Sequence, residues 1–324
     1  DLRKVLLTNL YIRYSNCKIF LNTVFIGGSF NYLERNRELN VTNVIIDISN
    51  FNGKHTVSVK NNHLSHEFRI DDVLNTLKIW GVTNISVNHL HNYNSDFTSY
   101  MQSINILLSN FNYDVIIHDY FYICPSINLF SSIDKYFCEV PDGDTCKKCI
   151  RNYKTEFTNN PINHYSSEFS SLDSWRDLFD EFLTNAKSII VPSQSTSKIY
   201  LQVFRNRMLS KVQVISHDVG YIKGHTTSVD KNKIKLKTLA IVGDISYTKG
   251  ALVIKELVKY ISSNNLDIKM LIVGDLELSV KSYVASYNCI QITGAYKGIK
   301  EMYQLVERNN VLCFLFPSLW PETF

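Results

Sequence analysis

Hydrophobic residues along the chain follow two alternating periods, one typical of buried strands and one typical of amphipathic helices. Strand-like runs predict strands at residues 18–26, 44–48, 84–88, 115–117, 188–191 and 211–215. Helical spacing predicts helices at residues 30–39, 71–81, 96–110 and 175–187, and another directly after Pro192-Ser193. Strands that alternate with helices favour an α/β fold with a mostly parallel sheet.

A polar, Gly-containing stretch from Gly220 to about residue 235 separates this series from a second one. The second series predicts strands at residues 238–242, 269–273, 290–293 and 311–316 and helices at residues 249–261 and 298–307. The continuous apolar run VLCFLF predicts that strand 311–316 is fully buried. We therefore expect two Rossmann-like domains, residues 1–219 and 220–324. Many dehydrogenases and ligand-binding proteins share this pattern, so function has to come from particular residues.

The composition is that of an ordinary globular protein, with 324 residues, 45% hydrophobic, 20% charged and a net charge of +4. No stripe of Lys or Arg is present, so we expect no nucleic-acid partner. No apolar run approaches the roughly 18–20 residues that cross a bilayer, and no signal peptide precedes the first strand. We expect a cytoplasmic protein, although the sequence leaves peripheral contact with a membrane open. The printed sequence begins at Asp1 rather than at Met.

Three segments that follow predicted strands carry candidate chemistry, because ligands of open α/β sheets bind outside the carboxyl ends of the strands. Between Gly243 and Gly250, glycine backbone and a helix N-terminus suit a phosphate, and Lys249 adds a positive charge; the alternative is an ordinary turn with a surface lysine. His118-Asp119 offers an imidazole that can bind a substrate or carry a proton; the alternative is a structural histidine. Glu322 can accept hydrogen bonds from sugar hydroxyls; the alternative is a solvated glutamate.

Four cysteines lie close together in the sequence, at Cys124, Cys138, Cys146 and Cys149. The CxxC pair that ends this group has the usual spacing of a zinc half-site, and four thiolates can close a structural zinc site with no open position. The alternative is four unligated thiols. We predict a turn at Asp142-Gly-Asp144, so no Asp-x-Asp motif remains to hold a catalytic metal, and no cofactor is expected for catalysis.

In their order along the chain, these segments resemble retaining glycosyltransferases of family 4 from the bacterial polysaccharide group. The resemblance covers roughly residues 84–324 and implies GT-B architecture, with two facing Rossmann-like domains. It rests on the following motifs: HDYFYICPSINL at 118–129, the cysteines ending in CKKC at 146–149, WR at 175–176, PS at 192–193, the loop from Gly243 to Lys249-Gly250, LIVG at 271–274, TGAY at 293–296 and FPSLWPETF at 316–324.

The resemblance implies roles for individual residues. Lys249 would bind the donor diphosphate beside the amides after Gly243, and Glu322 would contact the transferred sugar as the first Glu of an E-x7-E motif. His118, with Asp119 beside it, would support the donor sugar from the acceptor domain. The resemblance also implies the remaining positions: an amino-terminal glycine loop at Gly27-Gly28, and further donor-site residues at Asp244, Gly250, Gly274, Tyr296, Thr323 and Phe324.

Two departures from the family pattern change the expectation. Asp244 stands where many members carry an Arg, which leaves the neutralisation of the diphosphate to Lys249 and to backbone amides. The second Glu of the motif would lie beyond Phe324, where the printed sequence ends. We therefore expect a truncated second domain and a polypeptide that is inactive in this form.

These observations favour a transferase that moves a sugar, with retention, from a nucleotide-sugar donor to a saccharide or lipid-linked acceptor. A carbohydrate- or nucleotide-sugar-binding protein, or an inactive partner subunit, is the main alternative. A nucleotide-sugar epimerase has a similar two-domain build, but no convincing set of additional acid and base residues is found. An NAD-dependent oxidoreductase is least favoured, because no GxGxxG follows any predicted strand.

Overall fold

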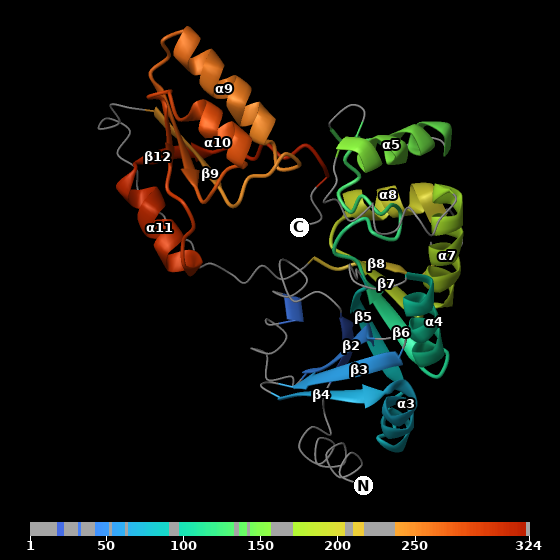
Figure 1. Ribbon diagram of the computed structural model, residues 1–324. Helices are drawn as coiled ribbons and strands as arrows, with labels where there is room; N and C mark the ends of the chain where they lie inside the picture. Colours follow the sequence, from blue (N-terminus) through green and yellow to red (C-terminus); the bar gives the residue numbers. More distant parts are fainter. Residues whose placement is uncertain are drawn as a thin grey trace. The chain divides into compact units, whose positions relative to one another are not determined.

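The computed structural model describes the chain at residues 18–22, 32–33, 43–51, 54–61, 64–90, 97–132, 136–140, 143–156, 171–204, 210–216 and 237–321. The chain divides into two compact units. Unit 1 extends to Val219, and unit 2 begins at Gly220. Both units are α/β, with parallel strands and helices packed on the sheet (Figure 1). Among the described helices, none has both the length and the hydropathy that crossing a bilayer requires.

Unit 1 is built on an eight-stranded sheet with the order β4-β3-β2-β1-β5-β6-β7-β8. The six strands from β2 to β8 in this order are parallel to one another. Its strands are β1 (Lys18–Asn22), β2 (Asn43–Phe51), β3 (Lys54–Asn61), β4 (Leu64–Arg69), β5 (Asn84–His89), β6 (Asn112–Ile116), β7 (Ser188–Val191) and β8 (Val212–Val214). Because β2 pairs with one side of β1 and β5 with the other, the direction of winding changes between β1 and β5.

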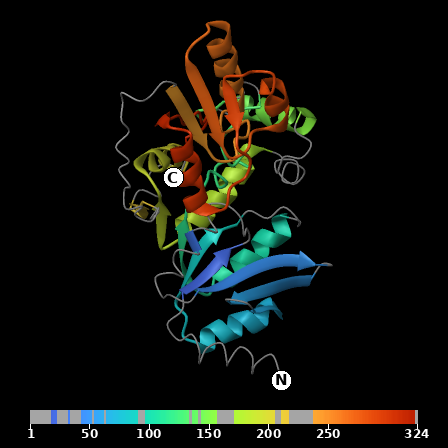
Figure 2. The same ribbon diagram turned by 90° about the vertical axis from the view of Figure 1, so that its left-hand side faces the viewer.

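The antiparallel strands β3 and β4 extend one side of this sheet, and the long arrows are clearest in Figure 2. We predicted neither strand. The pairing of Phe51 with Lys54 leaves a two-residue connection, and its sequence is Asn52-Gly53, the strongest short-range hairpin signal. Val57 and Val59 alternate with polar residues, as a strand requires. The sequence therefore contained the signal for this hairpin.

Aromatic side chains form much of the core of unit 1, and they come from the helices and from the segment after β6. Phe97 stacks on Trp175 with ring centroids 5.0 Å apart, and Phe121 meets Trp175 edge-on at 5.2 Å. Both contacts lie in the ranges that favour aromatic pairs. The helices of this unit are α3 (Ile70–Ile79), α4 (Phe97–Leu108), α5 (Gly143–Glu156), α7 (Leu172–Asn185) and α8 (Gln194–Phe204).

Unit 2 is a three-layer sandwich around a four-stranded parallel sheet. One face, which includes Ile241 and Ile272, packs against α9 and α10, while the other, which includes Ala240 and Leu271, packs against α11 (Figure 1). Neighbouring residues of one strand thus enter opposite layers, which explains the continuous apolar runs of these strands. The elements are β9 (Lys237–Val242), α9 (Ala251–Ser263), β10 (Ile268–Val273), α10 (Leu278–Val284), β11 (Ile290–Ile292), α11 (Gly298–Arg308) and β12 (Val311–Phe314).

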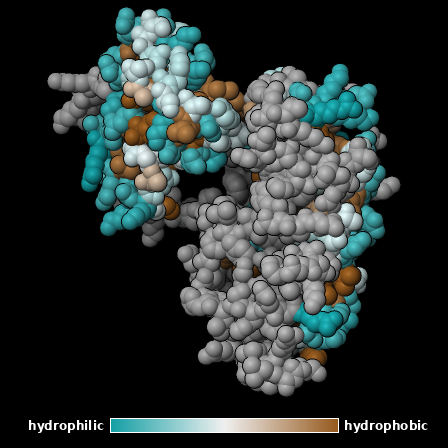
Figure 3. Space-filling view, in the orientation of Figure 1, coloured by the Kyte–Doolittle hydropathy of each residue, from teal (hydrophilic) through white to brown (hydrophobic). Residues whose placement is uncertain are grey.

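The prediction that residues 311–316 form a fully buried strand is wrong. Strand β12 is at the edge of its sheet, beside β9 alone. Leu312 and Phe314 are 45% and 48% exposed, and Phe316 after the strand is 82% exposed. Figure 3 shows brown, hydrophobic areas on the visible surface of unit 2. An apolar run indicates a strand, but its position within the sheet is set by strand order.

Most helix predictions are confirmed, namely those for α3, α4, α7, α8, α9 and α11. Two helices were missed. Helix α5 begins at Gly143, inside the turn predicted at Asp142-Gly-Asp144, and its residues GDTCKKCIRNYKTE are too polar for an apolar period. Helix α10 has only seven residues, too few for a clear period. The predicted helix at residues 30–39 and the end of the predicted strand at 18–26 lie largely outside the described residues.

Two glycines at the ends of β9 and β10 approach each other closely. Gly274 has φ 133°, and a Cβ placed on it would overlap the backbone carbonyl oxygen of Gly243. Gly243 itself has φ 125°. Only glycine is free of steric cost in such a conformation and can also allow this approach.

We expect Gly274→Ala to destabilise the chain by about 3 kcal/mol or more, because backbone strain adds to overlap with a neighbouring backbone. Gly294→Ala is the matched control: φ at Gly294 is also positive, at 78°, but nothing lies within 4 Å of its Cβ position. The control should cost about 1 kcal/mol, the strain alone. The free energies of unfolding would be compared by urea titration. Equal losses for the two variants would show that the approach to Gly243 is not restrictive.

Candidate functional site

The strand order of unit 2 points to a ligand site between β9 and β12. The order β11-β10-β9-β12 places the first strand of this unit between the second and the fourth. This is the arrangement of the first four strands of a Rossmann sheet, in which winding reverses between the first strand and the fourth. Ligands of open α/β sheets bind outside the carboxyl ends of strands at such a point. The segments there are residues 243–250 and residues 315–321.

These two segments are fastened to each other. The Leu319 N–H donates to the Thr248 carbonyl oxygen at 3.0 Å. Gly250 has φ 90°, and a Cβ on it would overlap the backbone of Pro317. The candidate phosphate loop is therefore supported by the Pro-rich segment in which Glu322 was predicted as a sugar ligand.

Gly250 is also the N-cap of α9, where it supplies no side-chain hydrogen bond to the first turn. The N-terminus of a 13-residue helix thus lies at the carboxyl end of β9. No side chain caps it, and its first N–H, that of Ala251, donates to the Ser246 carbonyl oxygen at 3.0 Å. Lys249 directly precedes it and is exposed, as is Asp244. A helix N-terminus with an adjacent lysine suits an anionic group such as a diphosphate.

The other predicted donor residues in the described part of unit 2 have structural surroundings of their own. The Gly274 N–H donates to Thr293 Oγ1 at 3.1 Å, which joins the ends of β10 and β11. Tyr296 packs against the sheet face formed by Ala240, Leu271 and Val273. Tyr296 therefore contributes to the core beneath α11, in addition to any contact with a ligand.

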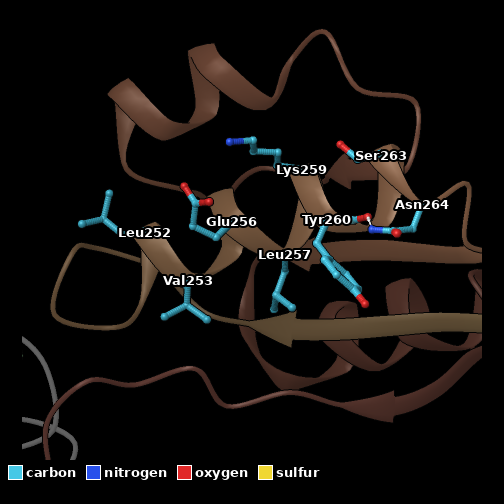
Figure 4. Close-up of a pocket in the computed structure, with 8 residues that line it drawn as sticks. All are labelled: Leu252, Val253, Glu256, Leu257, Lys259, Tyr260, Ser263 and Asn264. Carbon is cyan, nitrogen blue, oxygen red and sulfur yellow. Dashed lines mark hydrogen bonds between the residues drawn. The ribbon is translucent and has the colours of Figure 1, made fainter.

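A groove of about 700 Å³ runs along the outer side of α9, and Figure 4 shows its lining. It is mainly apolar and contains none of the predicted donor residues. The residues that line it are Leu252, Val253, Glu256, Leu257, Lys259, Tyr260, Ser263 and Asn264. We do not identify it with the predicted donor site.

Unit 1 carries a buried polar cluster where its own winding reverses, at the carboxyl ends of β1, β5 and β6. His118 Nε2 lies 2.8 Å from Asn88 Oδ1, and Asn88 Nδ2 donates to Asn22 Oδ1 at 2.8 Å. The exposed fractions of His118, Asn88 and Asn22 are 6%, 1% and 0%. The ring of Tyr32 meets the His118 ring edge-on at 5.4 Å. His118 is thus held in place from the strands beside it.

Asp119, the other predicted catalytic residue of unit 1, belongs to a second pair. Its Oδ2 lies 2.9 Å from His89 Nε2, and its Oδ1 accepts the Phe121 N–H at 2.8 Å. Sequence reasoning identified His118 and Asp119 but missed Asn22, Asn88 and His89. A signal was present for Asn88, which ends a predicted strand, the position at which we looked for ligands elsewhere.

The segment after β6 is held by side chains from α7 and α8. Trp175 Nε1 donates to the Phe121 carbonyl oxygen at 2.9 Å, and Arg176 Nε donates to that of Ile123 at 3.3 Å. Tyr200 donates its hydroxyl to the Asp119 carbonyl oxygen at 2.7 Å. Burial, followed by the nearby Asp119 carboxylate, raises the pKa of Tyr200, so this hydroxyl stays protonated and donates. The Trp-Arg pair of the sequence motif therefore supports the loop that carries His118.

We expect Tyr200→Phe to destabilise the chain by about 1–2 kcal/mol, because it removes the donor to a buried carbonyl and keeps the ring. The control is Tyr283→Phe, whose hydroxyl contacts Tyr287 at the surface at 3.2 Å. The control should change the free energy of unfolding by less than about 0.5 kcal/mol. Urea unfolding followed by circular dichroism would compare the two. A Tyr200→Phe chain as stable as the control would remove Tyr200 from the support of the loop.

The four predicted zinc ligands all lie among the described residues, and their thiols are close enough to interact electrostatically. Cys146 and Cys149 are on α5, and the Cys149 sulfur accepts a hydrogen bond from the Ser132 N–H at 3.3 Å. The Cys124 sulfur accepts one from the Ser126 N–H at 3.4 Å. Yet no group of three or more His, Cys, Asp or Glu side chains in the described part of the chain is arranged to hold a metal ion. The prediction of zinc at Cys124, Cys138, Cys146 and Cys149 is thus not supported.

Burial shapes the chemistry of these thiols. It raises the pKa of Cys138 to about 11 and that of Cys124 further above the ordinary range. A thiol with a raised pKa is protonated at neutral pH, and only the thiolate is a good nucleophile. Both residues therefore have the chemistry of structural thiols.

We expect Cys124 and Cys138 to react with iodoacetamide at pH 7.5 about a hundredfold or more slowly than an ordinary exposed thiol. The exposed Cys313 is the internal comparison, and Cys313→Ser identifies its contribution. The rate at Cys138 should keep rising as pH approaches 11, because the thiolate fraction grows until the pKa is passed. Peptide mass spectrometry would follow each site. Fast reaction at Cys138, or a rate that rises when a chelator is added, would contradict this and point back to a bound metal.

Five predicted site residues lie outside the described residues: Gly27, Gly28, Glu322, Thr323 and Phe324.

No protein-family model and no curated protein matches the chain. Structures to which it is similar include a glycosyltransferase from Rickettsia africae, with a TM-score of 0.48 and 14% identity over 95% of this chain and 74% of that one. Another is the pneumococcal O-GlcNAc transferase GtfA, solved with UDP and GlcNAc. Its TM-score is 0.41, and it is 13% identical over 78% of this chain. A third is a mutant of S. aureus TarM, solved with Fondaparinux, α-GlcNAc-glycerol and UDP. Its TM-score is 0.37, and it is 13% identical over 78% of this chain. The chain spans 42% of the length of each of the last two. With TM-scores below 0.5, these likenesses leave the function to be argued from the chain's own residues.

Proposed function

We propose that this chain is a glycosyltransferase of the GT-B type that binds a nucleotide-sugar donor on unit 2. The observation that carries the proposal is the meeting of three features between β9 and β12. They are the reversal of winding in the sheet, the N-terminus of α9, which no side chain caps, and Lys249 just before that helix. All three suit a diphosphate group.

The chemistry of sugar transfer gives these features a role beyond binding. As the bond from the sugar to the nucleoside diphosphate breaks, negative charge develops on the leaving diphosphate. Fixed N–H dipoles and a lysine at that position stabilise this charge. In many enzymes such electrostatic stabilisation of the transition state is the largest contribution to the rate. We assign this role to Lys249 and the first turn of α9. Retention of the anomeric configuration and membership of family 4 are part of the proposal on the strength of the motif resemblance.

The acceptor is assigned to unit 1, whose polar cluster contains His118 and Asp119. We propose a saccharide or a lipid-linked saccharide as the acceptor class, with His118 as a ligand of the transferred sugar. Glu322, at the end of the segment that supports the Lys249 loop, is the proposed ligand on the side of unit 2. No metal is included in the proposed reaction.

We expect a nucleotide sugar to raise the melting temperature of the chain, because a ligand that binds only the folded state stabilises it. UDP-, GDP- and dTDP-sugars would be compared by thermal shift. Lys249→Ala should weaken binding of the best ligand by about tenfold or more, which corresponds to one lost charge-assisted contact. Lys259→Ala is the matched control, an exposed lysine ten residues later and inside α9, and should bind like the parent chain.

Stabilisation by one nucleotide series that disappears in Lys249→Ala would support the donor site and identify its base. No stabilisation by any nucleotide sugar, in this chain or in one extended beyond Phe324, would overturn the proposal. Equal weakening by both lysine variants would show that Lys249 acts through general charge and not at the helix N-terminus.

A further inference from the structure

Asn22, Asn88 and His118 form a continuous chain of hydrogen bonds across three strands of unit 1. Asn22 is the last residue of β1, Asn88 is the second-to-last residue of β5, and His118 follows β6. The two links are each 2.8 Å long, and all three side chains are buried. Buried polar groups in such a row have fixed donor and acceptor roles, because reversing one reverses the next.

The two amides determine which nitrogen of His118 carries hydrogen. An amide nitrogen only donates and an amide oxygen only accepts. Asn88 uses its nitrogen toward the Asn22 oxygen and therefore presents its oxygen to His118. His118 Nε2 must then be the donor. In the neutral ring the lone pair is left on Nδ1, and the ring becomes charged only when Nδ1 gains a proton.

An amide partner has a different effect on the ring than a carboxylate would have. A carboxylate on a ring N–H favours the charged imidazolium, as in many catalytic pairs. Asp119 is adjacent to His118 in sequence, but its carboxylate is engaged by His89 and by the Phe121 N–H. The Nε2 atom of His118 thus meets an uncharged amide, while the carboxylate of the adjacent Asp119 contacts another histidine.

We propose that Asn88, fixed by Asn22, is a positioning residue that holds His118 as the neutral Nε2–H tautomer, with Nδ1 as its acceptor atom. The inference rests on the proposed function in one respect: His118 then accepts a hydroxyl hydrogen from the bound sugar and does not place a positive charge beside it. Asn88 touches no substrate in this scheme and acts through His118.

The test is nitrogen NMR of the full chain labelled with ¹⁵N at histidine. The chain has nine histidines, and the signals of His118 are those that disappear in His118→Gln. Two-bond proton–nitrogen correlations distinguish the two neutral tautomers and follow the pKa of the ring. The measurement needs no nucleotide sugar, so it can fail or succeed independently of the proposed function.

Two substitutions at Asn88 should move the pKa of His118 in opposite directions. Asn88→Asp keeps an acceptor for Nε2–H and adds a negative charge, so the pKa should rise by about one unit or more. Aspartate has almost the same size and shape as asparagine, so this substitution changes the packing around β5 little. Asn88→Leu removes the acceptor, which the charged ring needs more than the neutral ring, so the pKa should fall by about half a unit or more. Asn84→Leu, at the other end of β5, is the control and should leave His118 unchanged.

The direction in which Asn88→Leu shifts the pKa of His118 decides between the two possible donor and acceptor orders of the hydrogen bonds from Asn22 to His118. If Asn88 instead donated to a lone pair on Nε2, its removal would ease protonation and the pKa would rise. A rise in this variant, or hydrogen on Nδ1 of neutral His118 in the parent chain, would overturn the inference. The predicted tautomer together with a fall in Asn88→Leu would support it, even in a chain that bound no nucleotide sugar.

Discussion

Close approach of backbone to backbone at the carboxyl ends of strands is the constraint on which the candidate site of unit 2 depends. Gly274 lies against the Gly243 carbonyl, and Gly250 lies against Pro317, at distances that no side chain would allow. These contacts bring the ends of β9, β10 and the segment after β12 into one compact edge. The N-terminus of α9 opens onto that edge because Gly250 both permits the contact and begins the helix. Without these glycines, Lys249 and the helix dipole would have no fixed position.

Unit 1 meets a related requirement with large side chains instead of small ones. The segment that carries His118 is a loop by secondary structure, yet most of its residues are buried. Trp175, Arg176 and Tyr200 satisfy its backbone carbonyls, and the surrounding aromatic rings fill the space around it. A loop can be buried in this way only if its backbone polar groups find partners. The histidine therefore lies on a segment as firmly held as a strand.

The sequence predicted what is local and repeated. Apolar periods identified most strands and helices, and glycine and lysine next to a strand end identified the Gly243–Gly250 loop. Polar α5 and short α10 lacked such a period. The exposure of β12 could not be predicted, because the order of strands is set by packing between distant segments. The same holds for the hydrogen bond between Asn22 and Asn88, which are 66 residues apart in the chain. The hairpin of β3 and β4 was predictable from Asn52-Gly53 and was overlooked.

The hydrogen bond from the Leu319 N–H to the Thr248 carbonyl oxygen joins two loops that follow different strands. The two loops therefore form one structural unit at the edge of the sheet. Such a part cannot be exchanged piecemeal. A chimera that takes the 243–250 loop from another protein and keeps residues 315–321 would need a carbonyl in the position of Thr248 and a glycine in the position of Gly250. Redesign of ligand choice in this unit would therefore have to transplant both segments together.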